Sequence, residues 1–213
     1  MDPFTEVYSV KKGDKYQGFI ALDSKKEKYG YITTRGTIKI DFKYDSLAMI
    51  VNDTLYYKSI DVDNDKIIAK NGNKYGVLNL SKGTEILPFD YDMIYLSGDH
   101  YVVRKGEKYE LIDKKKDKVI DKSYDMIFEF DDIIVVSENK KLKFVDKKGK
   151  KIIDDEIELF VDYKEEGANN IFGYTATKVN DMINIEVDKP SDSGGYDIIK
   201  YEYDIKQKKL SKK

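Results

Sequence analysis

The sequence predicts an all-β fold, an antiparallel meander of three to four imperfect three-stranded repeats with a C-terminal capping hairpin. Three observations lead to this fold class. One motif returns at a nearly constant internal spacing. Short β-branched and aromatic runs alternate with turns that contain glycine or asparagine, which is typical of strands joined by hairpins. No segment shows the apolar period of an amphipathic helix.

The repeat is defined by two anchor positions. An aromatic or aliphatic residue opens each copy, and a second large residue, which is tyrosine followed by aspartate in the first three copies, closes it. The opening anchors are Tyr29, Tyr75, Tyr109 and Leu142, and the closing anchors are Tyr44, Tyr91, Tyr124 and Ile157. The two anchors lie 15, 16, 15 and 15 residues apart. Successive opening anchors lie 46, 34 and 33 residues apart, which places an insertion after the Tyr-Asp pair of the first copy.

Each copy is expected to hold three strands. The first copy opens with a strand at Tyr29–Ile32 and turns at Gly36, and its second strand runs to the Tyr-Asp corner. Pro88, at the end of the second strand of the next copy, suits a sheet edge because proline has no N–H to give to a neighbour. A third strand such as Tyr101–Val103 then returns to the following copy through a tight turn. Asn71–Asn73, with its Asn-Gly pair, is the clearest of these turns.

Three segments follow from this pattern. They are an N-terminal partial repeat at 1–27, a repeat array at 28–163, and a C-terminal segment at 164–213. In the last segment, Tyr174–Asp188 and Tyr196–Ile205 are predicted to form two long strands, followed by a lysine-rich tail. We expect this hairpin to cap the array, because an uncovered β edge pairs with other chains.

The composition indicates a folded chain without an overall positive field. Of 213 residues, 37% are charged and 40% are hydrophobic, and 18 Tyr with 9 Phe are more aromatic residues than a disordered chain carries. Lysine and arginine number 38 against 40 acidic residues, so nucleic acid is not expected as a partner. The lysine runs at 114–116 and 147–151 fall at expected turns, and the run at 206–213 lies in the tail. No apolar stretch approaches the roughly 20 residues of a membrane span.

The location of the protein is expected to be the cytoplasm as the sequence is written. Met1–Thr5 resembles a vector-derived addition ahead of Glu6, however, so secretion after removal of a leader stays an alternative. The sequence has no cysteine, which excludes a disulfide framework, a thiolate nucleophile and a cysteine-type zinc site.

The sequence offers few residues that are suited to catalysis or to metal binding. His100 is the only histidine and follows a Gly-Asp turn, so we expect it at the surface and predict no enzyme, no cofactor and no catalytic residue. The segment Asp61–Asp65 resembles the start of a calcium loop, but Lys66 stands where that loop needs glycine and Gly72 where it needs glutamate. We therefore expect a polar turn and no metal. Paired carboxylates occur at 131–132, 154–155 and 165–166, where adjacency alone says little among forty acidic residues.

The repeated Tyr-Asp pairs allow two interpretations. Exposed tyrosines and carboxylates at Tyr44, Tyr91 and Tyr124 would form a ladder of ligand contacts for sugars or peptides. In the structural interpretation, which we favour, each ring packs on the neighbouring copy and each aspartate accepts backbone N–H bonds at the corner. Repeats must bury an equivalent face in every copy, which is why the second interpretation is preferred.

The order of residues in the second copy resembles a known repeat family. Lys74–Leu78 reads Lys-Tyr-Gly-Val-Leu, and Ile86–Asp92 reads Ile-Leu-Pro-Phe-Asp-Tyr-Asp. This order is similar to the bacterial WG repeat, also written KWG, and the resemblance extends over about residues 28 to 160. Tyrosine, or Leu142 in the fourth copy, takes the place of the repeat tryptophan, and Glu110 replaces the glycine in the third. The resemblance implies a β-rich array with no general catalytic motif and no site residue to carry over.

These observations lead to two expectations about function. The first is a non-catalytic protein-interaction module of a bacterial or phage protein, which would mask or inhibit a macromolecular partner. The alternative is a module that binds carbohydrate or a cell surface through exposed tyrosines. The sequence names neither the partner nor the binding residues.

Overall fold

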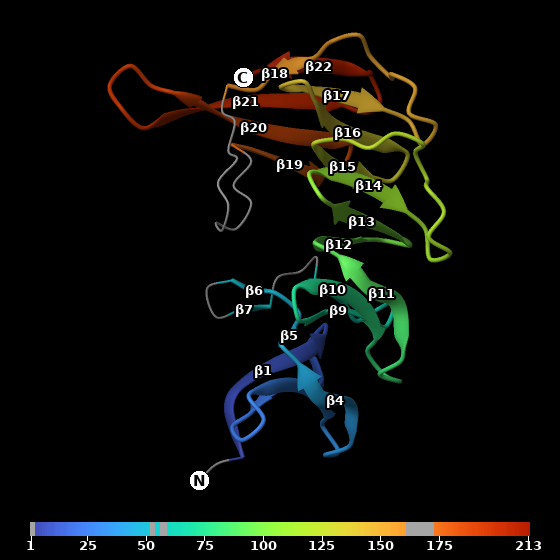
Figure 1. The fold of residues 1–213 in the computed structure, drawn as a ribbon. Coiled ribbons are helices and arrows are strands. Elements are labelled where there is room, and N and C mark those ends of the chain that lie inside the picture. The colour runs from blue at the N-terminus through green and yellow to red at the C-terminus, as the bar shows by residue number, and fades with distance from the viewer. Residues whose placement is uncertain (1–2, 52–53, 56–58, 161–172) are drawn as a thin grey trace. The chain divides into compact units, whose positions relative to one another are not determined.

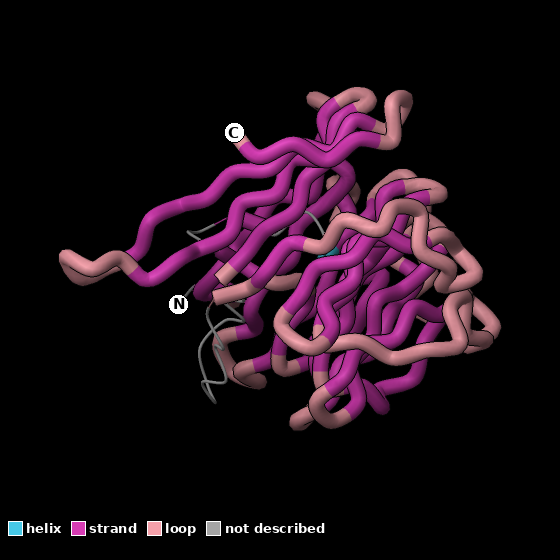
Figure 2. Tube along the Cα trace, turned by 90° about the horizontal axis from the view of Figure 1, so that it is seen from above, coloured by secondary structure: helices cyan, strands magenta, loops and turns pink. Residues whose placement is uncertain are grey.

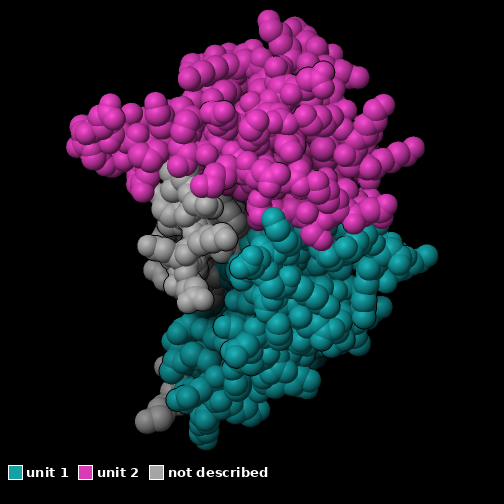
Figure 3. All heavy atoms as spheres, turned by 45° about the horizontal axis from the view of Figure 1, so that its top comes forward, with its two compact units in different colours: residues 1–118 teal, residues 119–213 magenta. Residues whose placement is uncertain are grey.

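The described part of the chain is all-β, as predicted. The computed structural model describes residues 3–51, 54–55, 59–160 and 173–213 (Figures 1 and 2). Twenty-two strands and no α-helix occur within these residues. Accordingly, this part of the chain offers no helix long and apolar enough to cross a membrane. The chain divides into two compact units, residues 1–118 and residues 119–213, which Figure 3 colours separately and which are described one at a time.

The first sheet of unit 1 is a four-stranded meander of consecutive strands. It contains β1 (Phe4–Lys12), β2 (Lys15–Asp23), β3 (Lys28–Thr33) and β4 (Ile38–Tyr44), each antiparallel to the next. The N-terminal partial repeat thus supplies two strands, and the first full copy supplies the other two. Sheet and sequence repeat are therefore offset by two strands.

The second and third sheets of unit 1 continue the same meander. The second sheet consists of β5 (Ser46–Leu47), β8 (Ile60–Asp61), β9 (Lys66–Asn71), β10 (Lys74–Asn79) and β11 (Glu85–Tyr91). The third consists of β12 (Met93–Ser97), β13 (His100–Lys105) and β14 (Lys108–Ile112). The insertion of the first copy holds a small pair of strands, β6 (Ile50–Val51) and β7 (Thr54–Leu55).

The second copy contains four strands, one more than the sequence analysis counted. The additional strand is β12, which follows the Tyr-Asp corner directly and pairs with β13 from Met93 opposite Arg104 to Ser97 opposite His100. Its alternation is short, with only Ile94 and Leu96 buried, and it continues the preceding strand without a glycine. These five residues therefore show no strand signal of their own in the sequence.

Two apolar clusters hold the sheets of unit 1 together. The first joins residues of the first sheet, such as Ile20 and Ile40, to Leu47 and Ile67 of the second. The second cluster joins Ile68 on the opposite face of β9 to residues of the third sheet. Strand β9 is thus buried on both faces, and each fully buried aliphatic side chain contributes about 1.5–3 kcal/mol.

Unit 2 consists of two further antiparallel sheets. The first contains β15 (Met126–Phe130), β16 (Ile133–Glu138), β17 (Lys141–Val145) and β18 (Ile157–Glu158). The second contains β19 (Tyr174–Val179), β20 (Met182–Pro190), β21 (Tyr196–Asp204) and β22 (Lys209–Lys212). Four-stranded antiparallel meanders of this kind are also the units of β-propellers.

The C-terminal region differs from the predicted hairpin with a tail. The first predicted strand is divided by a turn at Asn180, whose φ is +52°, and the lysine-rich tail forms β22. Strand β22 pairs with β21 from Tyr201 to Asp204, so the basic tail completes a sheet. Lysine side chains extend into water from a strand as readily as from a coil. The lysine-rich tail therefore shows no clear apolar alternation that would predict a strand.

The packing between the two sheets of unit 2 is aromatic and aliphatic. The ring centroids of Phe144 and Tyr203 lie 4.5 Å apart, and Phe128 meets the edge of Tyr174 at 6.0 Å. The alternating apolar side of β20 is fully buried; its members are Ile183, Ile185 and Val187.

The turn after the opening strand of each copy needs a left-handed residue. Gly36, Gly83 and Gly149 adopt φ of +79°, +70° and +75° there. The third copy places Lys116 at the same position, with φ of +72°. A side chain in this conformation costs about 1–2 kcal/mol relative to the right-handed region, and glycine avoids most of this cost.

We therefore predict that Lys116→Gly stabilises the protein by about 1 kcal/mol, despite the greater freedom of glycine in the unfolded chain. Chemical denaturation monitored by tyrosine fluorescence would measure the change. Lys115→Gly is the matched control, because Lys115 lies in the same turn without a positive φ. An equal or smaller stability for Lys116→Gly than for Lys115→Gly would contradict the repeat alignment.

Candidate functional site

The Tyr-Asp corners are structural joints. The rings of Tyr44, Tyr91 and Tyr124 are only 5%, 5% and 4% exposed, so they are closed to a ligand. Tyr44 stacks on Phe89 of the following copy with centroids 5.5 Å apart. This is the packing that the structural interpretation expected, and a ladder of exposed tyrosine contacts is not formed.

Each of the first two corner carboxylates joins one sheet to the next. Asp45 accepts hydrogen bonds from Lys28 Nζ in the first sheet and from the Gly72 N–H, at 2.6 Å, in the β9–β10 turn of the second. Asp92 repeats this between the second and third sheets. It accepts from Lys74 Nζ at 2.6 Å and from the Gly106 N–H at 2.8 Å. We call this arrangement the corner clamp.

The backbone of the corner repeats as faithfully as the carboxylate. The amide N–H groups of Asp45, Asp92 and Asp125 donate to carbonyls of β9, β13 and β16, respectively, at 2.9 Å in all three copies. The acceptors are Lys70, Arg104 and Ser137. The backbone of the corner therefore fixes the register of the next hairpin, and the aspartate side chain adds to this.

The clamp stabilises the charged form of its aspartate. The hydrogen bond from Lys28 lowers the pKa of Asp45 below its usual value, and the Gly72 amide lowers it further. The pKa of Asp92 is lowered in the same way, first by Lys74 and then by the Gly106 amide. Both carboxylates are partly exposed, so water screens part of this stabilisation.

The calcium-like segment is a network of local hydrogen bonds. Asp61 accepts from the Asn64 N–H at 3.0 Å and from Asn64 Nδ2 at 2.8 Å. Asp65 accepts from the N–H of Ser81 at 2.8 Å and from its Oγ at 2.6 Å. Asp63 pairs with Lys12 at 2.8 Å. Within the described ranges, no three histidine, cysteine or acidic residues gather as metal ligands would.

The remaining residues considered for catalysis lie apart from one another. His100 is half-buried at the start of β13, opposite Ser97 in a tight turn. Asp131 pairs with Lys178, and Asp132 lies 3.3 Å from Lys147. Residues 154–155 are exposed, and the pair at 165–166 lies outside the described residues.

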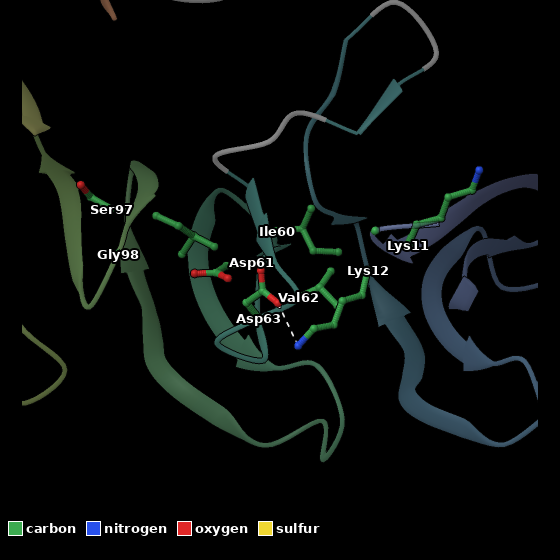
Figure 4. A pocket seen from close by; sticks show the side chains of 10 residues that line it. Lys11, Lys12, Ile60, Asp61, Val62, Asp63, Ser97 and Gly98 are labelled. Atoms are coloured by element: carbon green, nitrogen blue, oxygen red, sulfur yellow. Dashed lines mark ion pairs between the residues drawn. The ribbon is translucent and has the colours of Figure 1, made fainter. Parts of the chain in front are cut away.

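Unit 1 has a pocket of about 440 Å³ where three turns of its sheets converge (Figure 4). Its walls come from the β1–β2 turn at Lys11–Gly13, from Ile60–Asp63, and from the β12–β13 turn at Leu96–Gly98. The ion pair of Lys12 and Asp63 lies in it, and both side chains are mostly exposed to water. Its lining residues present no nucleophile beside a general base, and none is a histidine.

A buried lysine lies next to this pocket. Lys66 is 8% exposed; its Nζ donates to the carbonyl of Gly98 at 2.8 Å and lies 4.9 Å from the ring centroid of Tyr101. The ammonium is thus held by a carbonyl dipole and an aromatic face. This arrangement ties β9 to the β12–β13 turn and accounts for the lysine in structural terms.

A two-stranded ribbon extends from the second sheet of unit 2. Strand β19 pairs with β20 only as far as Val187, and β22 pairs with β21 only from Tyr201 onward. Asp188–Ile199, which we call the arm, therefore has no neighbouring strand on either side among the described residues. In Figures 1 and 3 it projects from its sheet as a long hairpin.

The arm carries exposed apolar side chains on one face. Tyr196 is 53% exposed and Ile198 is 57% exposed, and Pro190 pairs opposite Tyr196. At the tip, Gly194 and Gly195 adopt φ of +88° and +86°, which only glycine takes easily. Exposed apolar side chains that lie together on one face are typical of binding surfaces.

The family comparison decides between chance repetition and a known repeat. The model of the WG containing repeat matches residues 29–75 and 75–109. Residues 29–109 therefore consist of two WG repeats. The match covers the first two copies of the repeat, and residues 110–160, to which the sequence resemblance also extended, lie beyond it.

Comparison with solved structures supports the fold alone. The chain aligns with "Crystal structure of the eukaryotic initiation factor" at a TM-score of 0.52 and 9% identity, over 92% of this chain and 51% of that one. Kluyveromyces lactis Hsv2 aligns at 0.46 and 11% identity, over 91% and 59%. A protein of Bacteroides fragilis aligns at 0.38 and 10% identity, over 98% and 75%. The chain thus spans about half the length of the first structure, and no curated protein sequence matches it.

The glycine of the WG repeat has a packing reason in this chain. A Cβ on Gly30 would lie 2.8 Å from the ring of Phe42, and one on Gly76 would lie 3.0 Å from the ring of Phe89. Each phenylalanine stands two residues before the closing tyrosine of its repeat. The third repeat has Lys122 at that position, and its Glu110 pairs with Lys118 at 2.8 Å. Loss of the ring therefore accompanies loss of the glycine.

The side-chain and backbone partners of the corner carboxylates were not predicted from the sequence. A signal was present, because lysine precedes the opening tyrosine at Lys28, Lys74 and Lys108. The donors Gly72 and Gly106 were recognised only as turn residues, since a turn glycine is explained by its φ alone. The sequence does not distinguish the arm from the rest of the hairpin, because its alternation continues that of the buried part of β20 and β21.

We predict that Asp92→Asn lowers the free energy of unfolding by about 1 kcal/mol at neutral pH, because a charge-assisted clamp becomes a neutral one. The folded-state pKa of Asp92 is lowered, so its contribution is complete above the unfolded value of about 4 and is lost as the pH falls through the lowered pKa. The difference between wild type and variant should therefore shrink in acid. Denaturation curves from pH 7 to pH 2 would measure it. Asp90→Asn, at an exposed neighbouring position, should change little at any pH.

Proposed function

We propose that this WG-repeat chain is a non-catalytic protein-interaction module of a bacterial or phage protein, with the arm as its binding element. The observation that supports this most is the exposure of Tyr196 and Ile198 on a ribbon that no described strand borders. In this proposal the repeats form a scaffold, and the arm is the part of β20 and β21 that extends beyond the rest of its sheet. Binding then covers a surface of the partner and masks or inhibits it.

The non-catalytic part of the proposal is supported by the arrangement of the polar side chains. The carboxylates of the pocket and of the corners already hold lysine ammonium groups or backbone amides. A general acid or base must instead be placed to exchange a proton with a substrate. The proposal suits a cytoplasmic or an exported chain equally, because it needs no disulfide.

The carbohydrate alternative receives less support. Stacking on sugars needs exposed rings gathered on one face, and the tyrosines that are mostly exposed among the described residues are Tyr16 and Tyr196. These two residues lie in different units. The other described tyrosines are buried or half-buried.

The double variant Tyr196→Ser and Ile198→Ser should weaken binding to a captured protein partner by at least about tenfold, because exposed aromatic and aliphatic anchors supply most of the energy of an interface. The partner would be captured with the wild-type chain and identified, and its affinity measured by biolayer interferometry. Val179→Ser is the matched control, because Val179 is 57% exposed in the same sheet but outside the arm.

Two results would speak against the proposal. One is a double variant that binds as tightly as wild type while Val179→Ser does not. The other is glycan-array binding that disappears with Tyr16→Ala, which would favour the carbohydrate alternative.

A further inference from the structure

One face of the first sheet of unit 1 is apolar and partly open to water. Residues that pair directly across antiparallel strands share a face of the sheet. Two rows of such pairs cross the face opposite Ile20. The first row consists of Ser9, Phe19, Ile32 and Ile38, and the second of Val7, Ala21 and Gly30. Val7 is 56% exposed and Ile38 is 52% exposed, and we call this surface the open face.

The open face corresponds, position by position, to the face of the second sheet on which the first sheet packs. In the second sheet, Leu47 pairs with Ala69, which lies opposite the glycine of the second WG repeat. In the first sheet, Val7 pairs with Ala21, which lies opposite the glycine of the first WG repeat. Val7 thus has the position of Leu47. Leu47 is fully buried in the first apolar cluster, whereas Val7 is exposed.

Two further positions of the open face agree with this correspondence. Phe19 pairs with Ile32, two residues from the alanine–glycine pair, and Ile67 pairs with Leu78 at the same distance in the second sheet. Ile67 and Leu78 are buried, and Phe19 and Ile32 are half-buried. The first sheet therefore carries the residues of a sheet-to-sheet joint on a face that is incompletely covered.

A further WG repeat is a poor occupant of the open face, because the place of its closing tyrosine is filled. Between the first two sheets, Tyr44 stacks on Phe89, whose ring lies on the glycine of the second repeat. On the first sheet, Phe4 stacks in the same way on Phe42, with ring centroids 5.3 Å apart. The closing tyrosine of another repeat would therefore have to displace Phe4.

The place of the corner carboxylate is filled as well. A corner aspartate bonds to the turn that leads into an opening strand, as Asp45 does to the β9–β10 turn. In the first sheet this turn joins β2 to β3. Asp23 accepts from the N–H groups of Lys25 and Lys26 there, at 2.9 Å and 3.0 Å. The open face is therefore suited to an occupant that contributes an apolar face without a Tyr-Asp corner.

A second copy of the chain, bound through the same face, meets this requirement. The two rows of the open face contain no charged residue, so two-fold pairing brings no like charges together at its centre. At the margin, the Nζ atoms of Lys11 and Lys26 lie 4.5 Å and 6.0 Å from the ring centroids of Tyr16 and Phe42. Their ammonium groups can stay in water when the centre is covered. Antiparallel sheets pack face to face in this way, with their strands about 30° apart.

The last sheet of unit 2 disfavours head-to-tail pairing. Its face opposite Ile183 includes a row of Thr175, Glu186 and Lys200, and the last two form an ion pair at 2.8 Å. A polar outer face of this kind is typical of a capping repeat. Packing it against the open face would remove both charges from water without a new partner, which is costly. Two-fold pairing, in which both copies use the same patch, is also the commonest form of assembly.

We propose that the open face of the first sheet is a homodimer interface, in which two copies of the chain pack face to face about a two-fold axis. Val7, Phe19, Ile32 and Ile38 form its apolar centre. The interface is separate from the arm, so this inference does not rest on the proposed function. A dimer would carry two arms, which would raise the avidity for a partner that offers two binding sites.

Sedimentation velocity of the full chain, from about 1 μM to about 200 μM, should show an equilibrium between monomer and dimer. Val7→Lys and Ile38→Lys should each raise the dissociation constant of the dimer at least about hundredfold, because each places an unpaired ammonium group in the apolar centre. Val7 and Ile38 are exposed in the single chain, so circular dichroism and the melting temperature at the lowest concentration should match those of the wild type.

Two controls locate the interface. Val179→Lys changes an equally exposed valine of the last sheet and should leave the dissociation constant unchanged, as should the arm variant Tyr196→Ser and Ile198→Ser. A wild-type chain that stays monomeric at the highest concentration would overturn the inference. So would a dimer that persists when Val7→Lys and Ile38→Lys are combined, or oligomers that grow beyond two copies. A monomeric chain that loses its captured protein partner through Val7→Lys would assign the open face to that partner instead.

Discussion

The corner clamp is the interaction on which the repeat architecture depends. One carboxylate accepts a hydrogen bond from a lysine of one sheet. It accepts a second hydrogen bond from a backbone N–H in a hairpin of the next sheet. Because the bond connects consecutive sheets, a sequence repeat must contain the end of one sheet and the start of the next. This requirement explains why the repeat and the sheet are offset by two strands. It also explains why Tyr-Asp recurs, since the tyrosine is buried and the aspartate holds the two sheets together.

Much of this architecture could be predicted from the sequence. The anchors, the all-β fold and the turns with Gly36 and Gly83 follow from local patterns, since each reports a backbone conformation or a buried face. Strand β12 and the β22 strand of the lysine-rich tail could not be recognised. Both are short, and their pairing depends on distant partners rather than on their own alternation. The arm could not be predicted either, because the strands of a ribbon have the same alternation whether or not neighbouring strands cover them.

The sheets and the arm differ in where their aromatic and aliphatic side chains lie. The sheets of each unit bury their aromatic residues between them, as Phe144 and Tyr203 do in unit 2. The arm instead presents Tyr196 and Ile198 to water and has a turn of two glycines at its tip. Stability and binding are thereby placed on different parts of β20 and β21. Substitutions in the arm are expected to change binding without unfolding the sheet. Binding and stability can therefore be tested separately.

Amide hydrogen exchange at the turn glycines tests the clamp most directly. Gly72 and Gly106 donate to corner carboxylates, whereas Gly13 occupies the same place in the first hairpin, which no Tyr-Asp corner precedes. If the clamp joins consecutive sheets, the amides of Gly72 and Gly106 should exchange at least about tenfold more slowly than that of Gly13, as expected for bonds to a charged acceptor. Exchange of all three at the rate of an exposed turn would contradict the account.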